Sequence, residues 1–359
     1  MKRPSTIIRP LIALLIFFAA TIIVPHIFQD SPSNTADQTP VVISGRTMGT
    51  TYHISVVSSV DERIDKKEVQ RNIDSRLAHI NQLMSTYIKD SELSKINQAP
   101  AETWVNISAE TAQVIQSAQK ISAQTHGAFD ITVGNLVNLW GFGPDINLYA
   151  IPDEERLQAI LKESGYTKVK VQLSPPRIKK AHSSLYIDLS GIAKGYAVDQ
   201  IAELLVDSGY PNHLVEIGGE IRSGGLKSKD TSWNIGIERP ISGERSVQKV
   251  IQTRDTTAMA TSGDYRNYFE YEGKRYSHTI DPTNGYPITH KLAAVSVLHT
   301  SCMLADAYAT AFMVMGPERS MQFAKEHNMR IYMLVKRENG FVPLTSPAFE
   351  KFISSPQGK

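Results

Sequence analysis

The spacing of apolar residues predicts several amphipathic helices. In the segment 66–84 they recur every three or four positions, which places them on one helix face, at Val69, Ile73, Leu77, Ile80 and Met84. Ser108 is of a type that caps helix N-termini, and the following segment keeps the same period to about Thr125. A further helix is predicted over about 303–315, and Pro317 opens another.

Strand-like segments come in blocks rather than alternating one for one with helices. In the segment 41–57, Tyr52, Ile54 and Val56 alternate with polar residues, which is the period of a half-buried strand. Later strand-like segments are 213–217, 233–238, 247–253 and 330–335. This order favours an α+β fold over a doubly wound parallel sheet. Without a short-period repeat or an internal linker, the chain after residue 40 is expected to form one compact unit.

The N-terminal segment 1–28 predicts a membrane anchor. Lys2, Arg3 and Arg9 precede an almost wholly apolar run over 11–28, about 18 residues long, which is near the lower limit for a spanning helix. A cleaved signal peptide is the alternative, but no convincing small-x-small cleavage site follows the run. Residues 29–40 have the polar, Pro-containing composition of a flexible tether.

Composition and charge narrow the range of partners. The 359 residues are 41% hydrophobic and 21% charged, which is ordinary for a globular protein. A formal net charge of +2 and the lack of a long basic run argue against nucleic acid as a partner. Cys302 is the only cysteine, so no intramolecular disulfide can form, and we expect it to be a small buried apolar residue.

The segment 187–199 predicts a strand, a turn of small residues and an amphipathic helix. Gly191 and Gly195 let the backbone approach a ligand closely, and the free N–H groups at the start of a helix favour an anion. Asp188 and Lys194 add opposite charges beside this turn. The alternative is an ordinary strand-to-helix connection in which the glycines serve only the turn.

Asp306 and Thr310 form a candidate cation site. They lie four positions apart in a predicted helix, so their side-chain oxygens share one face. One carboxylate and one hydroxyl suit Mg²⁺ whose other ligands are a backbone carbonyl, water and substrate phosphate. The alternative is structural, with the aspartate hydrogen-bonded within the helix and the threonine bonded back to a carbonyl.

His278 follows a predicted strand and leads into the turn-forming segment 281–285. A histidine there can activate a hydroxyl or hold a phosphate, although a structural role is the alternative. Arg266, in the turn of 262–268, is a second candidate phosphate partner, and its alternative is a solvated surface cation.

Met48, Tyr87 and Phe129 lie in polar or glycine-rich turns rather than at core spacing, so they can stack on a planar ligand, although packing is the alternative for each.

The chain has no Gly-x-Ser-x-Gly elbow, no His-Glu-x-x-His and no Walker loop. It also has no dinucleotide-binding Gly-x-Gly-x-x-Gly after a strand. A phosphate-rich planar ligand with Mg²⁺ is what remains.

Eight motifs follow one another along the chain: Thr47–Thr50, Met84–Tyr87, Ala128–Gly134, Asp188–Gly195, Gly218–Gly219, Ser262–Arg266, Ser277–Pro282 and Ala305–Thr310. In this order they resemble the ApbE family of FAD:protein FMN transferases, over essentially everything from Val41 onward. The resemblance implies a single two-lobed α+β domain over 41–359, with mixed or antiparallel sheets and flanking helices.

Enzymes of this family split FAD at its pyrophosphate, attach the FMN phosphate to a Thr or Ser hydroxyl of an acceptor protein, and release AMP. The resemblance implies FAD as substrate and Mg²⁺ held by the Gly191 carbonyl, Asp306 and Thr310. It makes His278 and Asp306 candidate catalytic residues, with His278 activating the acceptor hydroxyl. It also implies FAD contacts at Met48, Tyr87, Ala128, Phe129, Asp130, Asp188, Lys194 and the Ile280 backbone.

The resemblance further implies a location and a class of partner. Many relatives carry a lipobox cysteine, which this N-terminus lacks, so a protein anchor in the bacterial inner membrane with the domain in the periplasm is favoured. Acceptors are expected to be membrane redox flavoprotein subunits with an Asp-Gly-x-Ser/Thr-Gly-Ala-Thr-like motif. At position 194 some relatives have an acidic residue in place of Lys194, so an FAD contact there is not expected to be essential.

Two other functions remain open at this point. One is a Mg²⁺-dependent FAD pyrophosphatase, in which water replaces the acceptor hydroxyl and free FMN and AMP are released. The other is a non-catalytic periplasmic FAD-binding protein. Asp306 and Thr310 together argue against the second, because a metal site is dispensable for holding a flavin ring.

Overall fold

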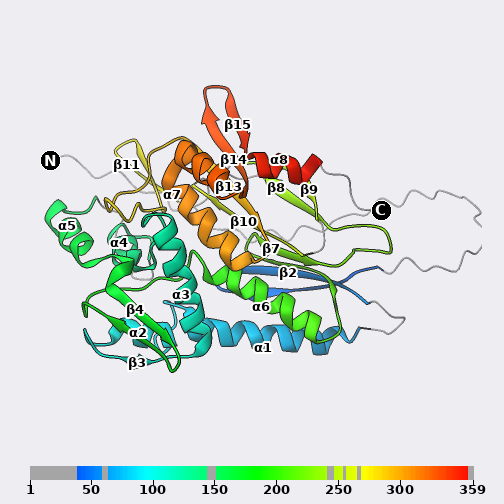
Figure 1. Ribbon diagram of the computed structural model, residues 1–359, viewed down its shortest axis with the longest axis horizontal. Helices are drawn as coiled ribbons and strands as arrows, with labels where there is room; N and C mark the ends of the chain where they lie inside the picture. Colours follow the sequence, from blue (N-terminus) through cyan, green and yellow to red (C-terminus); the bar gives the residue numbers. More distant parts are fainter. Residues whose placement is uncertain are drawn as a thin grey trace, which may run out of the picture. The chain divides into compact units, whose positions relative to one another are not determined.

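The computed structural model describes residues 39–58, 64–143, 151–240, 246–253, 256–264 and 268–354 (Figure 1). Contacts group Asp37–Lys359 into one compact unit, which confirms the predicted single α+β domain, while its division into two lobes stays a prediction. The predicted anchor 1–28 and Arg266 lie outside the described residues. Within them, no helix is both long and apolar enough to cross a membrane.

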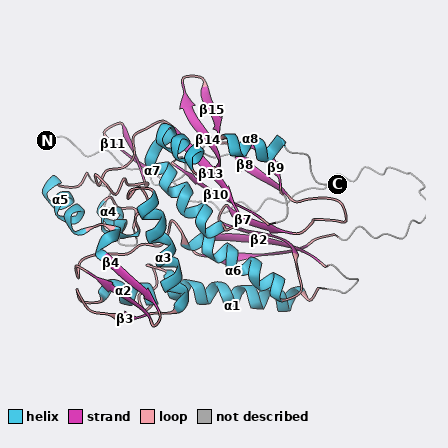
Figure 2. Ribbon diagram, in the orientation of Figure 1, coloured by secondary structure: helices cyan, strands magenta, loops and turns pink. Residues whose placement is uncertain are grey.

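The centre of the fold is an eight-stranded sheet in which every neighbouring pair is antiparallel. Figure 2 shows strands in magenta and helices in cyan. The strands of this main sheet, in spatial order, are β1 (Val41–Thr47), β2 (Thr50–Val57), β6 (Asn212–Ile217), β7 (Glu220–Gly224), β10 (Thr257–Gly263), β13 (Leu292–His299), β14 (Arg330–Arg337) and β15 (Gly340–Thr345). Of the two predicted possibilities, mixed or antiparallel, the main sheet is antiparallel.

Among the described residues, three smaller sheets accompany the main one. They are β3 (Val105–Asn106) with β5 (Pro176–Lys180) and β4 (Val169–Leu173), β8 (Asn234–Glu238) with β9 (Val247–Gln252), and β11 (Tyr268–Tyr271) with β12 (Lys274–Ser277). The strands β8 and β9 had been predicted from the segments 233–238 and 247–253, and they pair with each other rather than joining the main sheet.

The α-helices of the described residues are α1 (Lys66–Met84), α2 (Glu92–Gln98), α3 (Ala109–Gln124), α4 (Gly134–Leu139), α5 (Glu154–Glu163), α6 (Ala193–Asp207), α7 (Cys302–Glu326) and α8 (Pro347–Ser354), with 3₁₀ turns at Ile131–Val133 and Tyr166–Lys168. Helix α1 has the predicted bounds, and Ser108 caps α3 as predicted by accepting a hydrogen bond from the Thr111 N–H. Helix α7 includes both predicted C-terminal helices, which meet at a break where Gly316 has φ 77° before Pro317.

The central strands of the main sheet are covered on both faces. In β13, Val295 and Val297 pack in one apolar cluster with α7, whereas Ala294 and Leu298 pack in another with β8, β9 and α8. This double burial explains why the β13 sequence is an almost continuous apolar run instead of an alternating one.

The segment 187–189, predicted as a strand, joins no sheet in the described part of the chain, so that prediction was wrong. The Asn97 side chain takes the place of a partner strand. Its amide accepts a hydrogen bond from the Ile187 N–H (2.8 Å) and donates one to the Ile187 carbonyl (2.9 Å). The Asp188 N–H donates to the Ile131 carbonyl at 2.7 Å. These bonds give the segment an extended form without a β-ladder.

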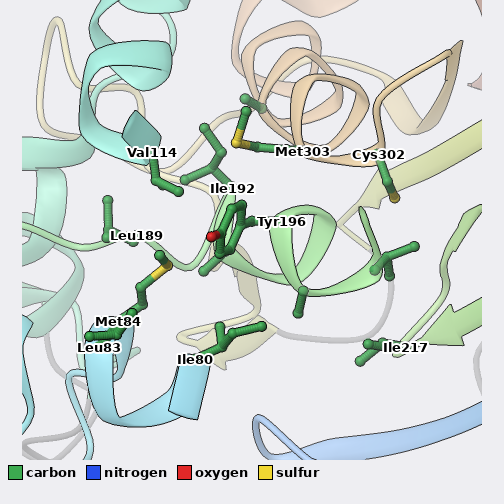
Figure 3. Packing of buried hydrophobic residues seen from close by; sticks show 14 of the residues in the cluster. Ile80, Leu83, Met84, Val114, Leu189, Ile192, Tyr196, Ile217, Cys302 and Met303 are labelled. Atoms are coloured by element: carbon green, nitrogen blue, oxygen red, sulfur yellow. The ribbon is translucent and has the colours of Figure 1, made fainter. Parts of the chain in front are cut away.

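Helices α6 and α7 pack closely near their N-termini (Figure 3). Tyr196 and Ile192, at the start of α6, lie in the main apolar cluster with Met303 and Cys302 of α7, and Cys302 is fully buried, as predicted. A Cβ atom on Gly195 would lie only 2.3 Å from the Cys302 carbonyl oxygen. Only glycine therefore permits this approach of the two helices.

We expect Gly195→Ala to destabilise the protein by about 2 kcal/mol or more, because the added methyl group must displace the backbone of α7. The loss should appear even though alanine has the higher helix propensity. The free energy of unfolding in urea measures it. As a control, Gly236→Ala in β8 should change that free energy by at most about 0.5 kcal/mol, since its Cβ would meet nothing closer than 3.5 Å. Equal losses in both variants would contradict the assigned role of Gly195.

Candidate active site

A cavity of about 790 Å³ collects residues from segments that are far apart in the sequence. This volume is in the range of small-molecule binding sites. Most of the predicted site residues line it, namely Tyr87, Ala128, Phe129, Asp130, Asp188, Gly191, Lys194, His278, Ile280, Asp306 and Thr310.

Met48 is not among the residues that line the cavity. It occupies the turn between β1 and β2, where Met48 (φ 48°) and Gly49 (φ 72°) both have the positive φ that a tight hairpin turn requires. The Met48 side chain packs against the main apolar cluster, and its neighbours Thr50 and Thr51 reach the cavity wall. A contact of Met48 with FAD therefore remains a prediction.

Asp306 projects from the second turn of α7 toward the start of α6. Its Oδ2 accepts a hydrogen bond from the Gly195 N–H at 3.0 Å, so the carboxylate caps a helix that has no side-chain cap of its own. Its Oδ1 lies 3.8 Å from the Lys194 ammonium and accepts no hydrogen bond from the described residues. Burial raises the pKa of Asp306, and the charge of Lys194 opposes that shift. The carboxylate of this cavity-lining residue thus has one oxygen in a structural hydrogen bond and one that makes only the longer ion pair with Lys194.

Thr310 lies one helical turn after Asp306 and next to the loop that precedes α6. A Cβ on Gly191 would be 3.2 Å from Thr310 Oγ1, so the Gly191 backbone and this hydroxyl are close neighbours. Ser262 Oγ is 3.4 Å from the same hydroxyl. The described residues hold no group of three or more His, Cys, Asp or Glu side chains placed to bind a metal. The predicted set differs from such a group in combining one carboxylate with a hydroxyl and a carbonyl, all hard oxygen donors that fit Mg²⁺.

Lys194 is held by a glutamate that had not been predicted as a site residue. Its ammonium donates to Glu220 Oε1 at 2.8 Å, and the Glu220 side chain is only 5% exposed. Burial raises the pKa of Glu220 to about 7; Lys194 works against this shift and Asp306 adds to it. Burial alone would lower the pKa of Lys194, but the two carboxylates raise it, so this lysine stays charged.

The carboxylates of Asp130 and Asp188 hold backbone in place. Asp130 accepts hydrogen bonds from the Thr132 N–H (2.8 Å) and hydroxyl (2.7 Å) and from the Tyr166 N–H (2.8 Å). Asp188 accepts one from the Ser190 N–H at 2.8 Å, which fixes the loop before Gly191. Both aspartates line the cavity, so these bonds shape its wall.

Two of the three predicted stacking residues face the cavity. Tyr87 is 71% exposed, which leaves its ring available to a ligand, whereas Phe129 is buried and packs beside Gly191. On another wall, His278 follows β12 and its ring lies edge-on to Phe142 with ring centroids 6.3 Å apart. Ile280 forms an isolated β-bridge with Pro287 that closes the turn after His278.

Sequence reasoning missed Glu220. It is the first residue of β7 and directly follows Gly218 and Gly219, whose φ values of 61° and 103° make the tight turn from β6. The turn directs β7 along the cavity and places its first side chain against Lys194. The sequence does contain one indication of its role: Glu220 directly follows Gly218–Gly219, which is one of the eight motifs shared with the ApbE family.

Comparison with known proteins places this site in a family. The model of the ApbE family matches residues 48–334. The chain is 45% identical over 314 residues to the FAD:protein FMN transferase of Vibrio cholerae, which covers 88% of this chain and 93% of the relative. It is 42% identical over 315 residues to the enzyme of the same name from Haemophilus influenzae. That alignment covers 87% of this chain and 91% of the relative.

Solved structures agree with this result. The flavin transferase ApbE from Vibrio cholerae matches with a TM-score of 0.80 and 43% identity, covering 88% of this chain and 99% of that one. The apo form of the flavinyl transferase ApbE from Pseudomonas stutzeri matches with a TM-score of 0.81 and 35% identity. The match covers 89% of this chain and 99% of that one. With the family match over most of its length, the chain belongs to the ApbE family.

Proposed function

We propose that this protein is an FAD:protein FMN transferase that attaches the FMN part of FAD to a Thr or Ser hydroxyl of an acceptor protein through a phosphoester bond, releasing AMP, with Mg²⁺ required. The names of the relatives support FAD as the substrate and a protein as the acceptor. The Mg²⁺ requirement and the details of the linkage are argued from the site.

The observation that carries the proposal is the junction of α6 and α7 in the cavity wall. There the Lys194 ammonium lies 3.8 Å from Asp306 Oδ1. Thr310 lies beside the Gly191 backbone, so a cationic hydrogen-bond donor and hard oxygen ligands occur together. A phosphate-rich ligand needs both kinds of group. Tyr87, exposed on the same cavity, offers a surface for a planar ring.

In this proposal Asp306, Thr310 and the Gly191 carbonyl would hold Mg²⁺. An ion held there would supply positive charge to neutralise the pyrophosphate and the departing AMP oxygen. The chain's own contribution is to position these ligands: Asp306 is oriented by the Gly195 N–H, and Thr310 lies within 3.4 Å of Ser262 Oγ.

The reaction forms one bond and breaks one. The acceptor hydroxyl oxygen attacks the phosphorus on the FMN side of the pyrophosphate, and the bond from that phosphorus to the bridging oxygen breaks. AMP departs with the bridging oxygen and both electrons of the bond. His278, on the cavity wall, takes the hydroxyl proton as general base.

Intact-mass spectrometry tests the proposal directly. The full chain is incubated with FAD, Mg²⁺ and an acceptor domain that bears Asp-Gly-x-Thr-Gly-Ala-Thr. We expect a covalent FMN adduct and an equal amount of AMP. Release of AMP and FMN without an adduct would establish the pyrophosphatase instead, and FAD binding without turnover would establish a carrier.

Asp306→Asn should slow adduct formation on the order of a hundredfold or more, whereas the exposed control Glu155→Gln should leave it unchanged.

His278→Ala should separate chemistry from binding. Loss of the base is expected to slow adduct formation by a factor on the order of 10² to 10⁴. The FAD dissociation constant, followed by flavin fluorescence, should change little, because the proposed role concerns the acceptor hydroxyl. A large loss of FAD affinity with a normal rate at saturation would instead make His278 a binding residue.

We also propose that the N-terminal segment anchors the protein in the bacterial inner membrane, with the domain in the periplasm, where it modifies membrane redox flavoproteins. The support is the apolar run over 11–28 with Lys2, Arg3 and Arg9 before it. Protease added to spheroplasts should degrade the domain, and a cytoplasmic marker should survive. Protection of the domain until the membrane is disrupted would reverse the proposed orientation.

A further inference from the structure

A buried carboxylate oxygen lies in the cavity wall without a hydrogen-bond partner. Among the described residues, Glu220 Oε2 is fully enclosed and receives no hydrogen bond, although Oε1 is paired with Lys194 at 2.8 Å. A half-satisfied buried carboxylate costs stability, and an apolar residue of similar size usually serves a core better. The position of this glutamate therefore indicates a role other than folding.

Lys194 is also poorly placed for helix stability. It lies in the first turn of α6, where a positive charge opposes the helix dipole. Its ammonium has two carboxylates within ion-pair distance, Glu220 at 2.8 Å and Asp306 Oδ1 at 3.8 Å. The lysine makes a hydrogen bond with the first and none with the second, so Asp306 Oδ1, in a residue that lines the cavity, accepts no hydrogen bond from the described residues.

We propose that Glu220 is a positioning residue that holds the Lys194 ammonium away from Asp306 Oδ1 and thereby keeps this oxygen open for a divalent cation. This inference rests on the proposed metal site. Without the Glu220 charge, Lys194 has Asp306 as its one remaining carboxylate partner among the described residues, and the ammonium then competes with the metal for the same oxygen. Glu220 acts only through Lys194 and needs no contact with the metal or with FAD.

The test is a double-mutant cycle on Mn²⁺ affinity, measured with the full chain and without FAD from the EPR signal of the unbound ion. Mn²⁺ accepts the same oxygen ligands as Mg²⁺. Glu220→Gln should weaken Mn²⁺ binding on the order of tenfold. Lys194→Met should strengthen binding far more in the Glu220→Gln background than in the unaltered chain, because only there has the lysine moved onto Asp306.

The alternative is that Glu220 acts only through its electric field. In that case Lys194→Met strengthens binding equally in both backgrounds, and such an additive cycle overturns the inference. Glu220→Asp gives an independent check that does not depend on the folding of Glu220→Gln. It keeps the charge but shortens its reach, so we expect several-fold weaker binding, while a pure field effect predicts none.

Glu216→Gln is the matched control. Glu216 lines the same cavity but pairs with His53 at 2.9 Å and accepts the Gly219 N–H, so its loss removes the same charge and leaves the Lys194 pair intact. Its effect on Mn²⁺ affinity should be about twofold or less. If the unaltered chain binds no Mn²⁺, the proposed metal site fails together with this inference. If it binds and the cycle is additive, only the inference fails.

Discussion

The site depends on two helices that cap each other. Asp199 of α6 accepts hydrogen bonds from the Cys302 N–H (2.9 Å) and the Met303 N–H (3.0 Å), the first N–H groups of α7. In return, Asp306 of α7 accepts the Gly195 N–H in the first turn of α6. Each helix therefore satisfies N–H groups that the other leaves open, at a crossing that is close because residue 195 has no side chain. The predicted metal ligands are fixed by the contact that joins the helices.

The antiparallel sheet supplies the other wall of the cavity. Its hairpin turn at Gly218 and Gly219 and the end of β10 at Ser262 and Gly263 reach the same space as α7. Helix α7 packs on β13 through a cluster that excludes water, while α8 and the β8–β9 pair cover the opposite face. A sheet that is buried on both faces can shift little, so the strand ends present their side chains to α7 at a fixed spacing.

The sequence predicted best what depends on local spacing. Helix α1 follows from its apolar period, and Asp306 and Thr310 share a face because they are four positions apart. Contacts between distant segments carry no such period. Nothing local indicates that Asn97 replaces a partner strand for Ile187, or that the Gly218–Gly219 turn brings Glu220 to Lys194. Met48, grouped with Tyr87 because both lie in polar or glycine-rich turns, packs against the main apolar cluster and is not among the residues that line the cavity.

The three charged groups at the junction, one ammonium and two carboxylates, affect one another. Two buried carboxylates without a cation would repel, and Asp306, whose pKa burial already raises, would be driven further toward its protonated form, which binds no metal. The positive charge of Lys194 prevents this protonation. However, the same ammonium group can compete with a metal ion for Asp306 Oδ1. Glu220 resolves the conflict, since a lysine held at 2.8 Å from one carboxylate still acts on the other through its field at 3.8 Å. An acidic residue at position 194 would remove both effects, so a chain with that exchange has to keep the aspartate proposed to bind the metal ionised by other means.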